Sequence, residues 1–296
     1  MRYPLTFAAF LAVLSSGACA AGPAPESAGP TEATAAQPAQ PAQASTVLDA
    51  ALWMQTSGEY EALTRQTWGA ASRRLAEAVS DSSWTALLEQ GEGYEALPTA
   101  AIVDVDETVL DNSPYAARLI EDHQRYSDAS WGQWVNEAKA RAIPGALDFA
   151  RTAADLGVTV FYVTNRAASL ENGTRRNLEA MGFPFTGEID VLLLKDERPD
   201  WGSDKTTRRA FVAQDYRVVV VAGDDLNDFM SGVRGVSRDE RARLVERNAD
   251  LWGTGWFVFP NPTYGSWEST LLDGLERPSP EDVTRRKLES LDAARG

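Results

Sequence analysis

The sequence has one cysteine, one histidine and few basic residues, and each shortage excludes a class of function. Among 296 residues there are 28 Lys and Arg against 43 Asp and Glu, a formal net charge of −15. This acidic excess argues against nucleic-acid polymers as the main ligand, because binding to a polyanion is carried by clustered Lys and Arg. A Ser-His-Asp triad, a two-histidine zinc site or a phosphohistidine mechanism would each depend on His123, which lies in a polar stretch typical of the surface. These exclusions leave catalysis by Asp and Glu carboxylates as the chemistry to consider.

Residues 1–21 are typical of an export signal. Arg2 is followed by the apolar run LTFAAFLAVL and then by small residues, a pattern too short to span a bilayer. Cys19 is a candidate for lipidation as the first residue of a bacterial lipoprotein, although Ser16 stands where that signal usually has leucine. Ordinary cleavage at the alanines after Cys19 is an equal alternative, and either way the mature chain has no disulfide. We therefore expect an exported protein, either an outer-membrane lipoprotein or a periplasmic or extracellular protein.

The rest of the chain divides into a linker, a folded domain and a tail. Residues 22–46 are almost entirely Ala, Pro, Gln, Glu, Ser, Thr and Gly and are expected to be a disordered linker, because they cannot bury a core. Residues 47–276 form the predicted domain, which begins with apolar residues at helical spacing. Breaks at Ser57 and Ser80 predict two or three helices there. In the polar tail, residues 277–296, Ser279 can cap a helix, and we expect a solvated helix without function.

Four short runs rich in β-branched residues follow, separated by longer helical or loop stretches. They are AAIVDV at 100–105, VTVFYV at 158–163, DVLLL at 190–194 and RVVVVA at 217–222. Strands that alternate with helices predict an α/β fold with a parallel sheet covered on both faces. The stretch 115–143 lies between the first strand and the next helix. Together with the N-terminal helices, it is expected to form a small, mainly helical cap that shapes substrate choice.

Polar side chains follow three of these strands. They are Asp104 and Asp106 after the first, Thr164, Asn165 and Arg166 after the second, and Asp224 and Asp228 after the last. Ligands of parallel sheets bind outside the carboxyl ends of the strands, so these groups should meet in one crevice. Crowded carboxylates repel unless a cation intervenes, and a donor set of oxygen atoms alone selects a hard cation such as Mg²⁺. Asp224 would complete the metal shell, with Asp228 behind it.

We expect Mg²⁺ to bind a phosphate group of the substrate, and a phosphoryl-transfer reaction assigns a role to each of these side chains. Asp104 would attack phosphorus as a nucleophile and form an aspartyl-phosphate. Asp106 would donate a proton to the leaving oxygen and later take one from water. Thr164 and Lys205 would hold the transferring phosphoryl oxygens.

The segments that carry these residues resemble a known family. They are AIVDVDETVLDNSPY at 101–115, VFYVTNR at 160–166, Lys205 and VVAGDDLNDF at 220–229, and the likeness continues through Trp131 to Val135, IPGALDF at 143–149 and PNPTYGSWE at 260–268. They resemble the four motifs of the haloacid-dehalogenase (HAD) superfamily and, more narrowly, the class C acid phosphatases, which include bacterial outer-membrane lipoprotein 5′-nucleotidases. The resemblance implies a HAD-like Rossmannoid three-layer fold. It also implies Mg²⁺ held by the carboxylates of Asp104 and Asp224 and by the main-chain carbonyl of Asp106.

The resemblance further suggests what the substrate is. It implies nucleoside 5′-monophosphates and related phosphomonoesters such as nicotinamide mononucleotide, an acidic pH optimum and a scavenging role. Trp131 and Tyr264 match the aromatic positions that stack on the substrate's ring in this family. Asn165 and Arg166 are expected to bind substrate, although an ion pair between Arg166 and an acidic loop is an equal alternative. Asp225 stands where the family usually has Asn or Thr, a departure that could alter metal affinity or pH response.

Two other functions stay open at this point. The first is a phosphotransferase that uses the same site and passes the aspartyl-phosphate to an alcohol. The second is a non-catalytic surface protein that binds an aromatic ligand or haem on a phosphatase scaffold. Among partners, a lipid anchor to a membrane and a homodimer are further expectations, although nothing in the sequence decides the oligomeric state.

Overall fold

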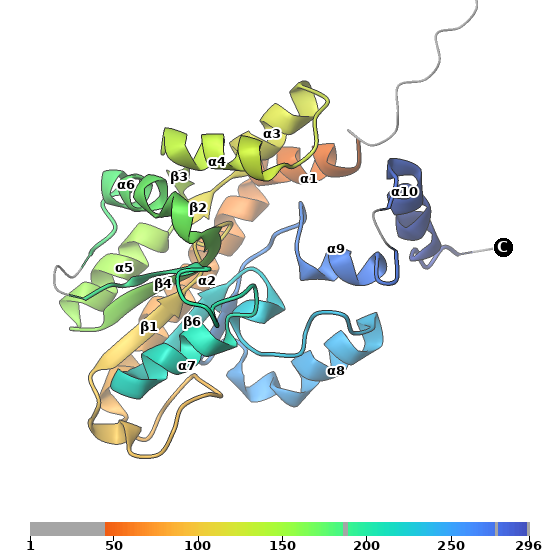
Figure 1. Cartoon of the computed structure of the whole chain (residues 1–296). Helices are drawn as coiled ribbons and strands as arrows, with labels where there is room; N and C mark the ends of the chain where they lie inside the picture. The colour runs from red at the N-terminus through yellow and green to blue at the C-terminus, as the bar shows by residue number, and fades with distance from the viewer. Residues whose placement is uncertain (1–44, 186–188, 276–277, 295–296) are drawn as a thin grey trace, which may run out of the picture. The chain divides into compact units, whose positions relative to one another are not determined.

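Five parallel strands form the main sheet in the order β5-β4-β1-β6-β7 (Figure 1). They are β1 (Thr99–Val103), β4 (Thr159–Ala167), β5 (Leu192–Lys195), β6 (Arg217–Gly223) and β7 (Trp256–Val258). The computed structural model describes residues 45–185, 189–275 and 278–294. These ranges lie within one of two units of the chain, residues 41–296. The expectations for residues 1–21 and for nearly all of the linker lie outside the described residues.

The four strands expected from the sequence are all present, and the fifth was not expected. All seven residues of β6 are buried, as are four of the five in β1. This burial explains why the two strands read as continuous apolar runs rather than as alternating patterns. In contrast, β7 has only three residues and pairs with β6 through Val221 and Trp256. A strand of this length is too short to give a recognisable apolar run in the sequence.

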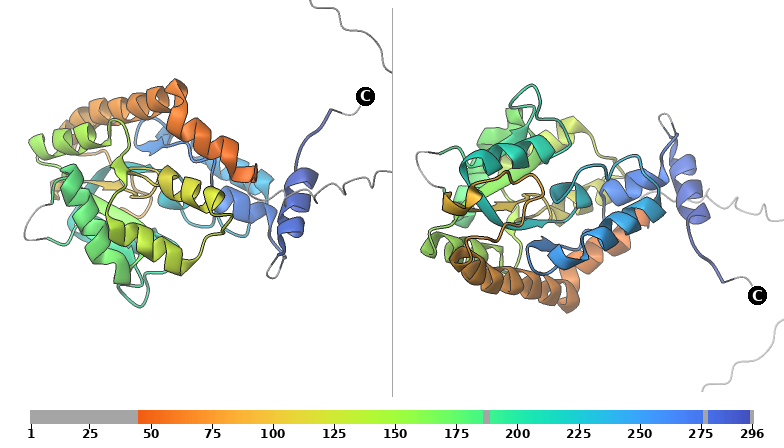
Figure 2. Two further views of the ribbon diagram at one scale, coloured as in Figure 1. Left: turned by 90° about the horizontal axis from the view of Figure 1, so that it is seen from above. Right: turned by 90° about the horizontal axis from the view of Figure 1, so that it is seen from below.

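Helices cover both faces of the sheet, as Figures 1 and 2 show. Helices α2 (Gly58–Ser80) and α5 (Ala146–Asp155) pack together on one face, and α7 (Thr206–Asp215) packs on the other, against β4 and β6. Trp68 of α2 lies between Phe149 and Phe259, with ring centroids 4.7 and 4.6 Å away. Helix α6 (Glu171–Met181) contacts β5. The expected three-layer α/β architecture is confirmed.

The insertion between β1 and α5 is mainly helical. It contains α3 (Ser113–Glu121) and α4 (Asp128–Glu137), and a short antiparallel pair joins its ends, β2 (Leu110–Asp111) and β3 (Arg141–Ala142). Helix α1 (Ser45–Thr56) packs on α3, and α4 packs on α6. The N-terminal helices divide in a way that the sequence did not indicate. Only α1 joins the insertion, whereas α2 has buried residues along its whole length and belongs to the layer on the sheet.

The C-terminal part adds three further helices. They are α8 (Arg238–Arg247), α9 (Ser266–Leu271) and α10 (Pro280–Glu289). The expected N-terminal cap of helix α10 is present, because Ser279 and Asp282 form a reciprocal capping box at the start of α10. However, α10 is not fully solvated. Lys287 pairs with Glu268 of α9 at 2.5 Å. The 3₁₀ helices are η1 (Tyr94–Ala96), η2 (Ala168–Leu170), η3 (Leu226–Asp228) and η4 (Ala249–Leu251).

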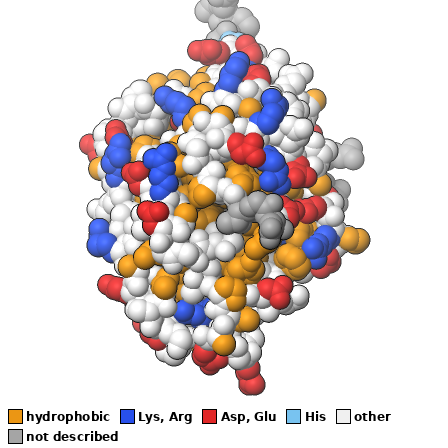
Figure 3. All heavy atoms as spheres, turned by 90° about the vertical axis from the view of Figure 1, so that its left-hand side faces the viewer, with side chains coloured by type: hydrophobic (Ala, Val, Ile, Leu, Met, Phe, Trp, Pro, Cys, Tyr) orange, Lys and Arg blue, Asp and Glu red, His pale blue; other side chains and the backbone are white. Residues whose placement is uncertain are grey.

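One face of the molecule carries side chains of mixed character. On the face shown in Figure 3, acidic and basic side chains are interspersed around an area of apolar side chains. The net charge of −15 is therefore not gathered into one acidic block on that face. Within residues 45–185, 189–275 and 278–294, no helix is both long enough and apolar enough to cross a membrane.

Candidate active site

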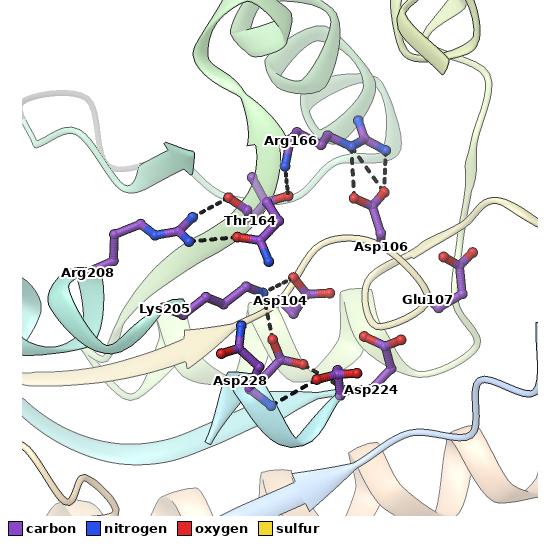
Figure 4. Close-up of polar contacts among 12 residues, drawn as sticks. Asp104, Asp106, Glu107, Thr164, Arg166, Lys205, Arg208, Asp224 and Asp228 are labelled. Atoms are coloured by element: carbon purple, nitrogen blue, oxygen red, sulfur yellow. Dashed lines mark hydrogen bonds and ion pairs between the residues drawn. The ribbon is translucent and has the colours of Figure 1, made fainter. Parts of the chain in front are cut away.

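The ends of the central strands bring the predicted carboxylates together (Figure 4). Asp104 and Asp106 follow β1, and Asp224 follows β6 directly. The two strands are parallel neighbours, so their carboxyl ends meet at the same edge of the sheet. Lys205 immediately precedes α7, and its ammonium group reaches into the same place.

Three carboxylates form the centre of the site. Oxygen atoms of Asp104, Asp224 and Asp228 all lie within 4.8 Å of one another. Nζ of Lys205 contacts Asp104 and lies 2.6 Å from Oδ1 of Asp228. The other oxygen of Asp228 accepts a hydrogen bond from the main-chain N–H of Asp225, at 2.9 Å. A Cβ at Gly223 would lie 2.2 Å from this oxygen, so the end of β6 needs a residue without a side chain.

Burial makes this cluster electrostatically unfavourable without a cation. Desolvation raises the pKa of Asp104 to about 7, although the Lys205 ammonium lowers it. Burial also raises the pKa of Asp224 well above its ordinary value, and the charges of Asp104 and Asp228 raise it further. Burial alone would lower the pKa of Lys205, but the adjacent carboxylates raise it. One ammonium group cannot offset three carboxylates, and the donors are all oxygen, so the site suits a hard divalent cation such as Mg²⁺.

Asp106 is held by an arginine. Nη2 and Nε of Arg166 lie 2.8 and 3.0 Å from Oδ1 of Asp106. The Arg166 side chain is almost fully buried, donates to Thr174 at 3.2 Å and lies 5.4 Å from the ring of Trp131. The structure thus shows the ion pair with an acidic loop. Arg166 also lines the site cavity, so its contact with substrate stays a prediction.

Thr164 is less exposed to the site than the sequence suggested. It lies inside β4, three residues before the strand ends, and is fully buried. Its hydroxyl accepts a hydrogen bond from the main-chain N–H of Arg166 at 3.1 Å. Asn165 lines the site cavity, and its Oδ1 accepts from the buried Arg208 at 2.7 Å. The predicted contact between Thr164 and phosphate thus stays a prediction.

A cavity of about 970 Å³ opens from the carboxylates. Asp104, Asp106 and Lys205 line it together with the expected aromatic residues, Trp131 and Tyr264. The insertion supplies further rings, among them Tyr115, whose centroid lies 5.1 Å from that of Trp131. The structure therefore brings a polar end and an aromatic wall into one space. His123, in contrast, is exposed in the turn after α3, as expected.

Sequence reasoning missed two buried residues that fix this geometry. Glu107 is 1% exposed and has a left-handed backbone conformation, with φ 55°. Its carboxylate accepts hydrogen bonds from the main-chain N–H of Asn112 at 2.8 Å and from the hydroxyl of Tyr264. Burial and the charge of Asp106 raise the pKa of Glu107 to about 8. Asn112 donates to Asp106 at 2.8 Å and accepts from Trp134 at 2.8 Å. Glu107 and Asn112 both lie in the 101–115 motif, and this motif was the signal in the sequence that could have identified them.

Polar contacts to the site come from the segment before α9 and from the first residue of α9. Nδ2 of Asn261 donates to Oδ2 of Asp224 at 2.7 Å, a link that the sequence did not reveal. The carboxylate of Asp225 accepts from Asn227 and from Ser266, at the start of α9. Asp225 is thus bound to α9. Its expected effect on metal affinity or pH response stays a prediction.

Comparison with known proteins decides the family. The family described as HAD superfamily, subfamily IIIB (acid phosphatase), matches residues 19–267. The chain belongs to this family. A solved class C acid phosphatase from Bacillus anthracis superimposes with a TM-score of 0.75 and 32% sequence identity, over 86% of this chain and 99% of that one. The resemblance identified from the motifs is therefore confirmed.

Curated plant relatives match part of the chain. The stem 28 kDa glycoprotein of Glycine max is 29% identical over 168 residues, which is 55% of this chain and 58% of the relative. Acid phosphatase 1 of Solanum lycopersicum is also 29% identical over 168 residues, which is 55% of this chain and 57% of the relative. The chain thus spans a little over half the length of these relatives.

Proposed function

We propose that this member of the acid phosphatase family is a Mg²⁺-dependent phosphomonoester hydrolase that prefers nucleoside 5′-monophosphates, including nicotinamide mononucleotide. One observation carries the proposal. Asp104, almost fully buried against Lys205, faces the cavity that Trp131 and Tyr264 line. The cavity thus combines a nucleophile, an adjacent cation and aromatic side chains. This combination suits a substrate in which a phosphate is joined to a ring.

In the proposed reaction, a carboxylate oxygen of Asp104 attacks phosphorus, and the bond from phosphorus to the leaving oxygen breaks. Asp106 donates a proton to that oxygen, and the alcohol leaves. Asp106 then takes a proton from the water that attacks the aspartyl-phosphate, which releases phosphate and restores Asp104. Lys205, with Thr164 as a second candidate, offsets charge on the phosphoryl oxygens.

The residues that would hold the metal are the carboxylates of Asp104 and Asp224 and the main-chain carbonyl of Asp106. Asp228 would lie behind them, because it already binds Lys205 and the N–H of Asp225. When bound, Mg²⁺ would neutralise charge on the phosphoryl group and hold it in line with the nucleophile. The crowding of buried carboxylates supports this assignment.

Two observations support the nature of the substrate. A Bacillus anthracis class C acid phosphatase has been solved with tungstate bound, and tungstate is a tetrahedral oxyanion like phosphate. In the cavity of this chain, the rings of Trp131 and Tyr264 offer stacking surfaces for a nucleobase.

The export signal of the sequence supports a location outside the cytoplasm. We propose an envelope protein, either lipidated at Cys19 or free in the periplasm or outside the cell, which releases nucleosides from nucleotides for uptake. A homodimer is part of the same proposal.

The test is phosphate release from a panel of nucleoside monophosphates, nicotinamide mononucleotide and p-nitrophenyl phosphate, with and without EDTA. We expect metal-dependent hydrolysis that disappears in Asp104→Asn. Asp239→Asn is the matched control, because that side chain is 76% exposed on α8. An added alcohol that accepts most of the phosphate would favour the phosphotransferase. No hydrolysis by folded, Mg²⁺-loaded enzyme would overturn the proposal in favour of a binding protein.

A further inference from the structure

The segment between β7 and α9 carries Tyr264 and is bound to both catalytic loops. We call residues 259–265 the Tyr264 strap. Three hydrogen-bond contacts at and next to the strap end on acidic residues that follow β1 or β6. They are Asn261 to Asp224 at 2.7 Å, the Tyr264 hydroxyl to Glu107, and the adjoining Ser266 to Asp225 at 2.6 Å. The strap is therefore held before, at and after the aromatic ring that lines the cavity.

The attachment after the ring is the densest of the three. Oδ2 of Asp225 accepts from the main-chain N–H of Ser266, and Oδ1 accepts from the Ser266 hydroxyl at 2.7 Å and from the N–H of Asn227 at 2.9 Å. Arg241 of α8 donates to the same hydroxyl at 2.9 Å. One carboxylate thus joins the loop after β6 to the first residue of α9.

Gly265 shows how closely the strap approaches this carboxylate. Its φ of 149° is one that side chains rarely adopt, and a Cβ there would lie 2.9 Å from Trp267 and 3.2 Å from Oδ2 of Asp225. The residue after Tyr264 therefore needs to be glycine for Ser266 to reach Asp225. The hydrogen bonds of Asp225 and the backbone of Gly265 together set the direction in which the strap leaves Tyr264.

The strap presents the Tyr264 ring in a fixed orientation. Tyr264 is 44% exposed as a residue and lines the cavity, while its hydroxyl is bound to Glu107. A ring held in place before the ligand arrives loses little conformational entropy on binding. We propose that Asp225 is a positioning residue that holds the Tyr264 ring over the cavity and thereby sets the preference for phosphomonoesters that carry an aromatic or heterocyclic ring. This inference rests on the proposed hydrolysis of phosphomonoesters at Asp104.

An aspartate suits this role better than an asparagine. A carboxylate accepts from all three donors, whereas an amide has one oxygen and one NH₂ group. With its NH₂ toward the Ser266 N–H, Asn would place two donors face to face. In the flipped orientation, its NH₂ would face the N–H of Asn227, so that bond would be lost, and the Ser266 hydroxyl would have to accept instead of donate. Either orientation weakens the link between Asp225 and Ser266.

The experiment compares a nucleoside 5′-monophosphate with ribose 5-phosphate, which has the same phosphate and sugar but no base. The ratio of the two kcat/KM values measures how much the ring contributes. We expect this ratio to fall by about 5- to 10-fold in Asp225→Asn, the effect of one lost hydrogen bond. Ser266→Ala, which keeps the main-chain bond, should cause a smaller fall. Asp239→Asn changes charge equally on the surface of α8 and should leave the ratio at the wild-type value.

Inhibition gives a second readout, independent of turnover of the nucleotide. In Asp225→Asn, the Ki of the free nucleoside should rise by the same factor as the ratio falls, whereas the Ki of inorganic phosphate should not change. If both substrates lose activity equally, Asp225 acts only on the fold or the metal site, and the inference is overturned. An unchanged ratio in folded Asp225→Asn or Ser266→Ala also overturns it. If the wild-type enzyme hydrolyses neither substrate, or hydrolyses both with the same kcat/KM, the proposed function itself is wrong, whatever the role of Asp225.

Discussion

Arg166 binds Asp106 through two nitrogen atoms, with Nη2 at 2.8 Å and Nε at 3.0 Å from Oδ1. Arg166 belongs to β4, whereas Asp106 follows β1. The guanidinium is buried and is held in turn by Thr174 of α6. The orientation of the proposed acid and base is therefore set by a neighbouring strand and not only by the loop that carries it.

We predict that Arg166→Lys impairs the proton transfer to the leaving group. Lysine keeps the charge but cannot form the two-nitrogen contact, so Asp106 would lose its fixed direction. A poor leaving group such as a nucleoside needs the proton, whereas p-nitrophenolate leaves without it. We expect kcat/KM, which reports the formation of the aspartyl-phosphate, to fall about 10²-fold for the nucleotide and much less for p-nitrophenyl phosphate.

The control for this variant is Arg65→Lys, at a side chain that is 57% exposed on α2. Steady-state kinetics with both substrates would check the prediction. Equal losses with the two leaving groups would show that Arg166 supports the site in another way.

A second prediction concerns Lys205, whose ammonium lies between Asp104 and Asp228. In Lys205→Met, two buried carboxylates would face each other without a cation, and removing one partner of a buried ion pair costs about 3–5 kcal/mol. We expect this loss in the free energy of unfolding at neutral pH in EDTA, measured by urea titration. The loss should shrink in acid, where the carboxylates are protonated.

Lys139→Met serves as its control, because Lys139 is 69% exposed and should change stability little. A loss for Lys205→Met that is the same at all pH values would argue that packing, rather than charge, is what Lys205 contributes.

A third prediction is the pH dependence of the metal-free protein. Folding raises the pKa of Asp104 to about 7 and that of Glu107 to about 8, so between pH about 4 and these values the folded state binds more protons than the unfolded state. The free energy of unfolding must therefore fall as the pH rises through this window. Mg²⁺, which favours ionised carboxylates, should raise the melting temperature more at about pH 7.5 than at about pH 5.

The measurement is a series of thermal unfolding curves in EDTA and in Mg²⁺ across this range. Glu107→Gln removes one of the two groups and should flatten the dependence in EDTA. A metal-free protein that becomes more stable as the pH rises from about 5 to 8 would contradict the expected sign of the dependence.

The sequence predicted the sheet and the carboxylates because both depend on local pattern. Buried parallel strands such as β6 read as continuous apolar runs, and Asp104 and Asp224 follow such runs directly. The sequence did not predict β7, because three residues are too few to show a pattern. The direction of a polar side chain depends on segments far along the chain. For this reason, the sequence could not show that Asp225 binds Ser266, 41 residues further along the chain.

The last prediction concerns Asn112, which links the insertion to the site. Its Nδ2 donates to Asp106 and its Oδ1 accepts from the indole of Trp134, each at 2.8 Å. Asn112→Ala would leave the buried indole N–H without this acceptor, which costs about 1–3 kcal/mol, and would remove one of the bonds that orient Asp106. We expect both lower stability and lower kcat.

A double-mutant cycle with Trp134→Phe separates the two effects. Once the indole donor is gone, Asn112→Ala should cost less stability, with a coupling of about 1 kcal/mol, while its effect on kcat should persist because the bond to Asp106 is independent of Trp134. Asn172→Ala, at an exposed position on α6, controls for loss of an amide. If stability losses add without coupling, the contact between Asn112 and Trp134 does not stabilise the insertion. If kcat recovers in the double variant, Trp134 and not Asn112 governs the orientation of Asp106.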